Sequence, residues 1–147
     1  MAKMKPQYLL VAFLSLTMTL VLTGCSLQFQ AHADLDRHRK LWASQGIENY
    51  SYTLANWSVL SDEEILCAVD VRNNALSPAD ASCGYTVEEL FAVSERQLAE
   101  SDSILTQHVA DIEYDDRYGM PISICSREKD IPASFGCFKV NDFVVFD

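Results

Sequence analysis

The sequence predicts an α+β fold, in which an antiparallel sheet of about five strands carries two helices packed on one face. Two stretches, over residues 34–45 and 86–101, place apolar side chains at helical spacing. The segments between and after them alternate apolar and polar residues, as half-buried strands do. The elements below are taken in chain order.

The chain begins with a segment typical of an export signal. Lys3 and Lys5 provide a positive start, Tyr8–Leu22 is nearly uninterrupted apolar sequence, and small residues then precede a cysteine. The apolar run is about fifteen residues long, short of the roughly 20 that a membrane-spanning helix requires. We therefore expect residues 1–24 to be a signal peptide rather than an uncleaved anchor.

The end of this segment, Leu22-Thr23-Gly24-Cys25, resembles the lipobox of bacterial lipoproteins. The resemblance implies that Cys25 is lipidated and becomes the first residue of a mature protein attached to a membrane of the cell envelope. Ser26 follows the cysteine, where an aspartate is associated with inner-membrane retention, so the outer membrane is favoured in a Gram-negative cell. A signal peptide without lipid is the alternative. Residues 25–33 would form a lipidated tether, and residues 34–147 a single domain.

Charge and length limit the classes of function. The signal carries two of the eleven basic residues and none of the twenty-one acidic ones. The mature chain, residues 25–147, would therefore have nine basic and twenty-one acidic residues and a net charge of −12. This excess argues against nucleic acid as a partner, because phosphates would be repelled. It suits a soluble surface, and it would attract a basic partner such as another envelope protein.

Four cysteines remain once Cys25 is assigned to lipid: Cys67, Cys83, Cys125 and Cys137. An even number in an exported domain predicts two disulfides, and no spacing here is typical of a zinc site. Cys125 and Cys137 both fall on the outer side of alternating strands that could be antiparallel neighbours. We therefore favour the pairs Cys67–Cys83 and Cys125–Cys137.

The first predicted helix runs from Asp34, a suitable N-terminal cap, to Gln45, with Gly46 ending it. Its apolar side comprises Leu35, His38, Leu41 and Trp42, and His38 is interpreted as a residue at the edge of the core. Strands are expected at Tyr50–Leu60 and from Ile65 to Val71, where Ile65, Cys67, Val69 and Val71 face inward. Asn73-Asn74 marks a turn, and an irregular loop runs from Ser77 to about Gly84.

The second helix, 86–101, begins with a capping box, since Thr86 and Glu89 can each bond the other's backbone N–H. After it, Ala110, Ile112 and Tyr114 alternate with acidic residues. Arg117-Tyr118-Gly119 turns the chain into a strand from Pro121, with Ile122 and Ile124 inward. The last strand is expected from about Phe135 to Phe146, with Phe138 and Val140 inward.

Several of these stretches together resemble an uncharacterised family of small bacterial exported proteins, domain of unknown function 6174. The likeness covers roughly Arg37 to Phe143, and the turn of many members reads Tyr-Gly-Tyr-Pro where this chain has Met120 in place of the second tyrosine. The family implies an exported or lipid-anchored α+β domain with no assigned chemistry and no catalytic residues. The stretches are Tyr50-Ser51-Tyr52-Thr53, Val69-Asp70-Val71, Thr86-Val87-Glu88-Glu89-Leu90-Phe91 and the run Ile112–Ile124, which contains Tyr118-Gly119-Met120-Pro121.

No motif predicts an enzyme, a cofactor or a metal ion. The histidines, His32, His38 and His108, lie in no nucleophile or metal motif, and the acids Asp111, Glu113, Asp115 and Asp116 lack EF-hand spacing. We therefore expect a protein-binding or adaptor module. The alternative is an inhibitor of a basic, lysozyme-like periplasmic enzyme. A hydrolase ranks third. The candidates for an exposed contact are the turn Tyr118, Gly119 and Met120, together with Trp57.

Overall fold

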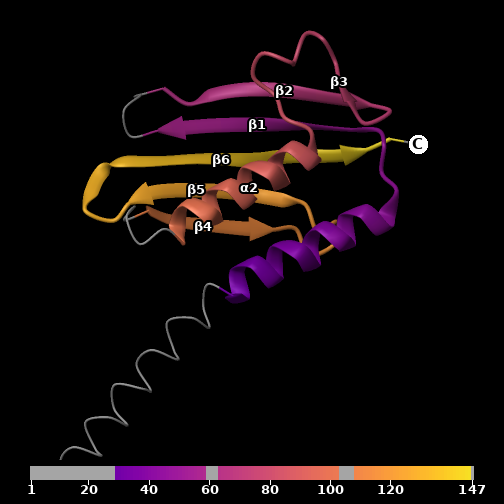
Figure 1. Cartoon of the computed structure of the whole chain (residues 1–147). Coiled ribbons are helices and arrows are strands. Elements are labelled where there is room, and N and C mark those ends of the chain that lie inside the picture. The colour runs from indigo at the N-terminus through magenta and orange to yellow at the C-terminus, as the bar shows by residue number, and fades with distance from the viewer. Residues whose placement is uncertain (1–28, 59–62, 103–107, 147) are drawn as a thin grey trace, which may run out of the picture.

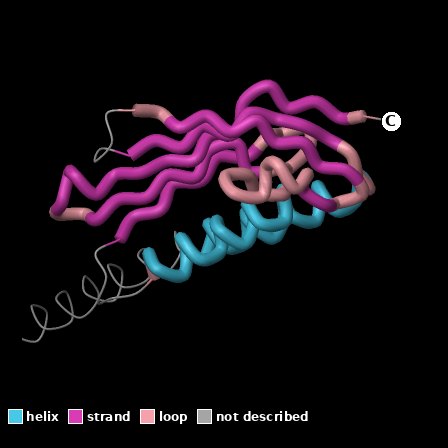
Figure 2. Tube along the Cα trace, turned by 90° about the horizontal axis from the view of Figure 1, so that it is seen from above, coloured by secondary structure: helices cyan, strands magenta, loops and turns pink. Residues whose placement is uncertain are grey.

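The structure is a computed structural model that describes residues 29–58, 63–102 and 108–146. It consists of one six-stranded antiparallel sheet with two helices on the same face (Figures 1 and 2), which confirms the predicted α+β class. The strand beyond the expected five is β3, a two-residue edge strand. The elements after the N-terminal helix are β1 (Tyr50–Ser58), β2 (Ile65–Arg72), β3 (Ala75–Leu76), α2 (Val87–Ser101), β4 (His108–Tyr114), β5 (Pro121–Glu128) and β6 (Ile131–Val145).

The strand order is β3-β2-β1-β6-β5-β4, so the last strand of the chain lies beside the first. This pairing joins the N-terminal hairpin to the C-terminal three-stranded unit and aligns Trp57 with Cys137. β6 begins at Ile131 and not near Phe135, because its first residues continue the hairpin with β5, where Ile131 pairs with Glu128.

The N-terminal helix is longer than the sequence suggested. Residues 29–45 are helical, so the predicted start at Asp34 is wrong, and five of the eight residues assigned to the tether after Cys25 are helical too. The physical reason is that residues 29–33 contain neither Gly nor Pro, and Ala31 packs against the core. Inside the helix, the carboxylate of Asp34 instead pairs with Arg37 one turn later, at 3.1 Å. The predicted end is confirmed by Gly46, whose φ is +61°.

The turn between β2 and β3 follows the prediction as well. Asn73 and Asn74 have φ of 51° and 61°, the left-handed conformation that tight hairpins need and that Asn tolerates.

At the far end of β2, Ile65 is 57% exposed, contrary to the inward position predicted for it. It pairs with Asn56 at the end of the β1–β2 ladder, and Asn56 is exposed as well.

The capping box of α2 is present as predicted. The Thr86 hydroxyl accepts from the N–H of Glu89 at 3.2 Å, and the Glu89 carboxylate accepts from the N–H of Thr86 at 2.7 Å. A neighbouring amide at this helix start, the N–H of Val87, donates to the hydroxyl of buried Tyr50 at 2.9 Å. Tyr52, also on β1, donates to the carbonyl of Tyr85. Two tyrosines of the first strand therefore hold the start of α2 in place.

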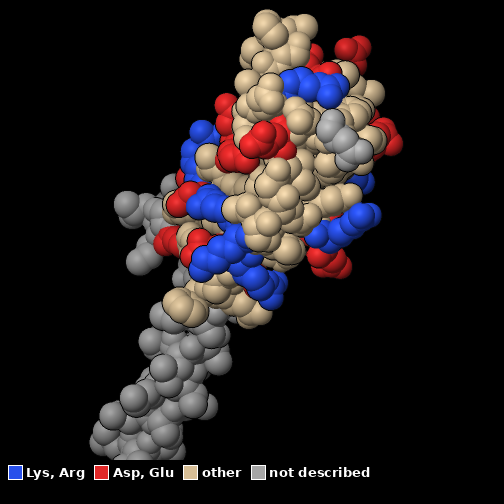
Figure 3. All heavy atoms as spheres, turned by 90° about the vertical axis from the view of Figure 1, so that its right-hand side faces the viewer, with Lys and Arg blue, Asp and Glu red and all other residues tan. Residues whose placement is uncertain are grey.

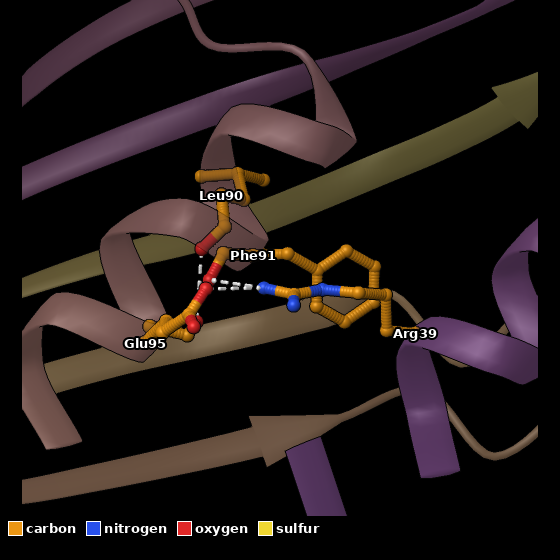
Figure 4. A network of polar contacts seen from close by, with 5 residues as sticks. Arg39, Leu90, Phe91 and Glu95 are labelled. Atoms are coloured by element: carbon orange, nitrogen blue, oxygen red, sulfur yellow. Dashed lines mark hydrogen bonds and ion pairs between the residues drawn. The ribbon is translucent and has the colours of Figure 1, made fainter. Parts of the chain in front are cut away.

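Side chains of the two helices are linked to each other at two places. The guanidinium of Arg39 donates to Glu95 at 2.9 Å and to the carbonyl of Phe91 at 3.4 Å, and it lies 5.6 Å from the centre of the Phe91 ring (Figure 4). The indole N–H of Trp42 donates to Glu88 at 2.9 Å. Such partly exposed pairs add little free energy individually, but they fix the helices relative to one another.

The core lies between the helices and the covered face of the sheet. It contains the inward residues of β1 and β2 and the apolar side of α2, among them Tyr50, Leu54, Val69, Leu90 and Phe91. Trp42 and Leu35 of the N-terminal helix close one side of it. Burying this surface is the main stabilising contribution to the fold.

Candidate functional site

The two helices cover only one face of the sheet (Figure 2). Along β1, Tyr50, Tyr52 and Leu54 point into the core, so the residues between them point the other way. We call this second side, which carries Ala55 and Trp57, the open face. A sheet face of this kind needs polar or small side chains unless something binds to it.

Register assigns the side chains of the open face to two rows that cross the strands. The first row runs from β4 to β2 through Glu113, Ser123, Lys139, Ala55 and Leu66. The second row runs from β4 to β1 through Asp111, Cys125, Cys137 and Trp57. Residues far apart in the chain thus share one surface.

A groove of about 620 Å³ lies across these rows. Small residues form its floor, namely Ala55, Ser123 and the Cys125–Cys137 disulfide, whereas longer side chains stand around it. Trp57 and Phe135 make its aromatic wall, with ring centres 5.0 Å apart and an interplanar angle of 75°. A second hollow of about 380 Å³ continues from it along β4 and β5 and shares Cys125 and Phe135. The concavity therefore results from small residues beside large ones.

Exposed apolar surface accompanies the groove. Trp57 is 41% exposed, Leu66 62% and Val109 36%. An apolar, partly aromatic depression with a few charged groups at its rim is the usual composition of a binding site.

The charges at the rim are mainly negative. Glu64 and Glu113 line the groove and Asp111 lines the adjoining hollow, against Lys139 in the groove and Arg127 in the hollow. Within the described ranges, neither Glu64 nor Glu113 forms an ion pair with Lys139 or Arg127. Elsewhere, opposite charges lie side by side, as on the end of the domain seen in Figure 3, where basic and acidic side chains adjoin. The groove is thus a place where carboxylates remain available to a partner.

Both predicted disulfides are confirmed. Cys67–Cys83 joins the covered face of β2 to the loop before α2, with 6.0 Å between the Cα atoms. Cys125–Cys137 joins β5 to β6 on the open face, where the two residues are direct cross-strand partners 4.1 Å apart at Cα. The lipobox, Leu22, Thr23, Gly24 and Cys25, lies outside the described residues.

The exposed position predicted for the contact turn is wrong for Gly119 and Met120. Met120 is 1% exposed and belongs to the core, and the ring of Tyr118 packs against Phe143 with 5.2 Å between centres. Gly119 is buried with φ of +80°, and a Cβ there would lie 2.6 Å from the carbonyl oxygen of His38. The turn therefore docks on the N-terminal helix, and of its three predicted contact residues only Tyr118 is half-buried rather than buried. Trp57 alone of the predicted contact residues is exposed.

The three histidines lie apart, each with its own partner. His32 pairs with Asp102 at 2.7 Å, His108 with Gln97 at 2.9 Å, and the His38 ring stacks on Tyr114 at 4.3 Å. Burial lowers the pKa of His38, and the charge of Arg37 adds to this effect, so the ring is neutral at pH 7. The part of the chain that the structure describes contains no group of three or more ligands placed to hold a metal ion.

Of the four acids considered for calcium, Asp115 shapes the β4–β5 turn, since its carboxylate accepts from the N–H groups of Arg117 and Tyr118 at 2.9 and 2.6 Å. Asp111 and Glu113 lie exposed on the open face.

A smaller cavity of about 210 Å³ lies between the N-terminal helix and β4 and is lined by Asp34, His38 and Tyr114, among others. The Nδ1 atom of His38 and the hydroxyl of Tyr114 are buried and make no hydrogen bond to described residues. Burial raises the pKa of Tyr114 to about 12, so this hydroxyl stays protonated at neutral pH. No sequence pattern predicts this cavity, because its lining comes from three separate elements.

Fold and groove together define a small, doubly disulfide-bonded α+β domain with a one-sided sheet. Among the described residues, no helix is both long and apolar enough to cross a membrane. Residues 34–130 match the model of a family of unknown function (DUF6174), and the chain belongs to this family. No curated protein and no solved structure matches the chain.

Proposed function

We propose that this chain is a lipid-anchored protein of the cell envelope that acts by binding another protein through the open face of its sheet. The observation that carries the proposal is the groove of about 620 Å³, with exposed Trp57 beside it. Apolar and aromatic residues in a concave surface are the usual anchors of protein interfaces, and tryptophan is foremost among them. The proposal assigns the site no chemical reaction.

Anchoring and compartment are supported by two features. The segment Leu22–Cys25 resembles a lipobox, and two disulfides suit an oxidising compartment. We expect Cys25→Ser to move the protein from the membrane to the soluble fraction without changing its two disulfides. Cell fractionation with mass mapping of the non-reduced peptides measures both. Continued membrane retention of the variant would refute lipid anchoring through Cys25.

The binding proposal is tested by capture from cross-linked envelopes with the full chain as bait. Trp57→Ala should lose the captured partner, because it removes the aromatic wall of the groove. Val144→Ala is the matched control, since Val144 pairs with Ser51 at the other end of the open face and is 49% exposed. Equal capture by both variants would contradict the proposal.

A second candidate is favoured by charge. The whole chain has a net charge of −10, which would draw it toward a basic protein, and an inhibitor of a basic, lysozyme-like enzyme is such a case. The purified chain should then slow a basic lysozyme at low salt and lose this effect as salt screens the charges. Undiminished lysozyme activity at low salt would exclude this candidate and leave the adaptor role.

A further inference from the structure

The groove offers two separate anionic positions. Glu64 immediately precedes β2, and Glu113 lies on β4, so β1, β6 and β5 lie between them. Neighbouring strands are about 4.8 Å apart, which places the two backbone positions about 19 Å from each other across the sheet. One cationic side chain cannot pair with both carboxylates at that separation.

Each anionic position has a second feature suited to a cation. Glu64 lies beside Trp57, whose exposed ring can hold an ammonium or guanidinium group over its face. Glu113 lies two residues from Asp111 on the same side of β4, so two carboxylates act together there. All three acids are free of ion pairs with other described residues.

The middle of the groove has the opposite charge. Lys139 lies in the same row as Glu113, next to Ser123 and Ala55, and beside the disulfide. Its ammonium repels a cation at the centre and suits an acidic or apolar side chain there. The sequence of charges across the groove is therefore negative, positive, negative.

We propose that the groove binds an extended segment of a partner protein that crosses the strands, with a lysine or arginine at each end and an acidic or apolar centre. This inference rests on the proposed function and names the partner's chemistry. An extended chain advances about 3.3 Å per residue, so basic residues six apart, which point to the same side, span about 20 Å and fit the two positions.

The test uses the full chain in neutral detergent and a fluorescently labelled peptide of extended, Thr-rich sequence. The peptide has lysines six residues apart, with Leu and Asp facing the same side between them. Fluorescence anisotropy measures its affinity. Glu64→Gln and Glu113→Gln should each weaken binding about tenfold, because each removes one charged contact. Asp36→Asn on the N-terminal helix removes the same charge elsewhere and should leave the affinity within about twofold.

Two further comparisons fix the arrangement. A peptide with its lysines only two residues apart should bind about tenfold more weakly than the first, since it reaches one anionic position at a time. Replacing Lys139 by methionine should weaken binding of the Asp-containing peptide and strengthen binding of a peptide with lysine at the centre. If the methionine variant instead binds the Asp-containing peptide more tightly and the peptide with a central lysine more weakly, the proposed charge pattern is wrong.

The outcomes separate this inference from the function on which it rests. Suppose Glu64→Gln and Glu113→Gln match Asp36→Asn, while Trp57→Ala still loses the captured envelope partner. The open face is then a binding surface and the basic-segment inference is wrong. If the Trp57→Ala variant still binds both the peptide and the envelope partner, the basic-segment inference and the proposed function are both wrong. Binding of soluble glycan fragments in place of the peptide would also overturn the inference, because it assigns the groove to a protein segment.

Discussion

Replacement of Gly119 by alanine should destabilise the fold because two separate costs fall on one residue. Its φ of +80° is a conformation that side chains disfavour, at roughly 1–2 kcal/mol. The added Cβ would also lie 2.6 Å from the carbonyl oxygen of His38 and 3.0 Å from Cβ of Leu41. The carbonyl belongs to the helix backbone and cannot move alone, so relief of this contact costs a further 1–3 kcal/mol, roughly.

Gly46 provides the matched control. It has a similar φ of +61°, but a Cβ there meets nothing within 4 Å. Gly46→Ala should therefore cost only the conformational part, about 1 kcal/mol. The difference between the variants isolates the close contact between the β4–β5 turn and the N-terminal helix.

Urea unfolding of the purified chain, followed by tryptophan fluorescence, gives both values, because Trp42 is buried against this core. We expect Gly119→Ala to lose about 3 kcal/mol and Gly46→Ala about 1 kcal/mol. Equal losses for the two variants would show that the turn does not press on the helix. The placement of Met120 in the core would then be in doubt as well.

Three further predictions concern the disulfide, the tyrosine cap and pH. Replacing Cys125 and Cys137 together by alanine should lower the free energy of unfolding by about 3 kcal/mol, because the disulfide closes a loop with a sequence separation of 12. An unchanged denaturation midpoint would contradict this. Tyr50→Phe should cost roughly 1–2 kcal/mol, because it leaves the buried N–H of Val87 without its acceptor, and unaltered unfolding would show that water replaces the hydroxyl. Since the pKa of His38 is lowered from 6.5 in the folded chain, the unfolded chain binds a proton first as pH falls below about 6.5, and stability decreases there. His38→Gln should flatten this acid limb of a pH series of midpoints, and a limb of unchanged slope would assign it to other groups.

Much of the local structure could be predicted from the sequence. The Thr86–Glu89 capping box and the Asn73-Asn74 turn depend on residues within one turn of each other, so neighbouring sequence is enough to specify them. The pair Cys125–Cys137 could be inferred from strand alternation, because both cysteines fall on the polar side of adjacent strands. The start of the N-terminal helix was wrongly predicted at Asp34. A good capping residue is also tolerated inside a helix when a residue such as Arg37 pairs with it.

The candidate site depended on contacts that no local pattern encodes. Tyr118-Gly119-Met120 has the composition of an exposed turn, and only the packing of the N-terminal helix over it buries Met120. The hydroxyl of Tyr50 at the start of α2 is likewise a contact between residues far apart in the chain.

The sequence by itself determined the fold class and the pairing of the cysteines, because both rest on short-range periodicity and on residue type. The export signal over residues 1–24 stays a prediction from the sequence. Only the tertiary structure decided where the proposed binding surface lies. The groove exists because β1 pairs with β6, which brings Trp57 beside Cys137 and places small residues between large ones on one face. Pairing between the first and last strands is set by the packing of the whole core, and so no single stretch of sequence predicts it.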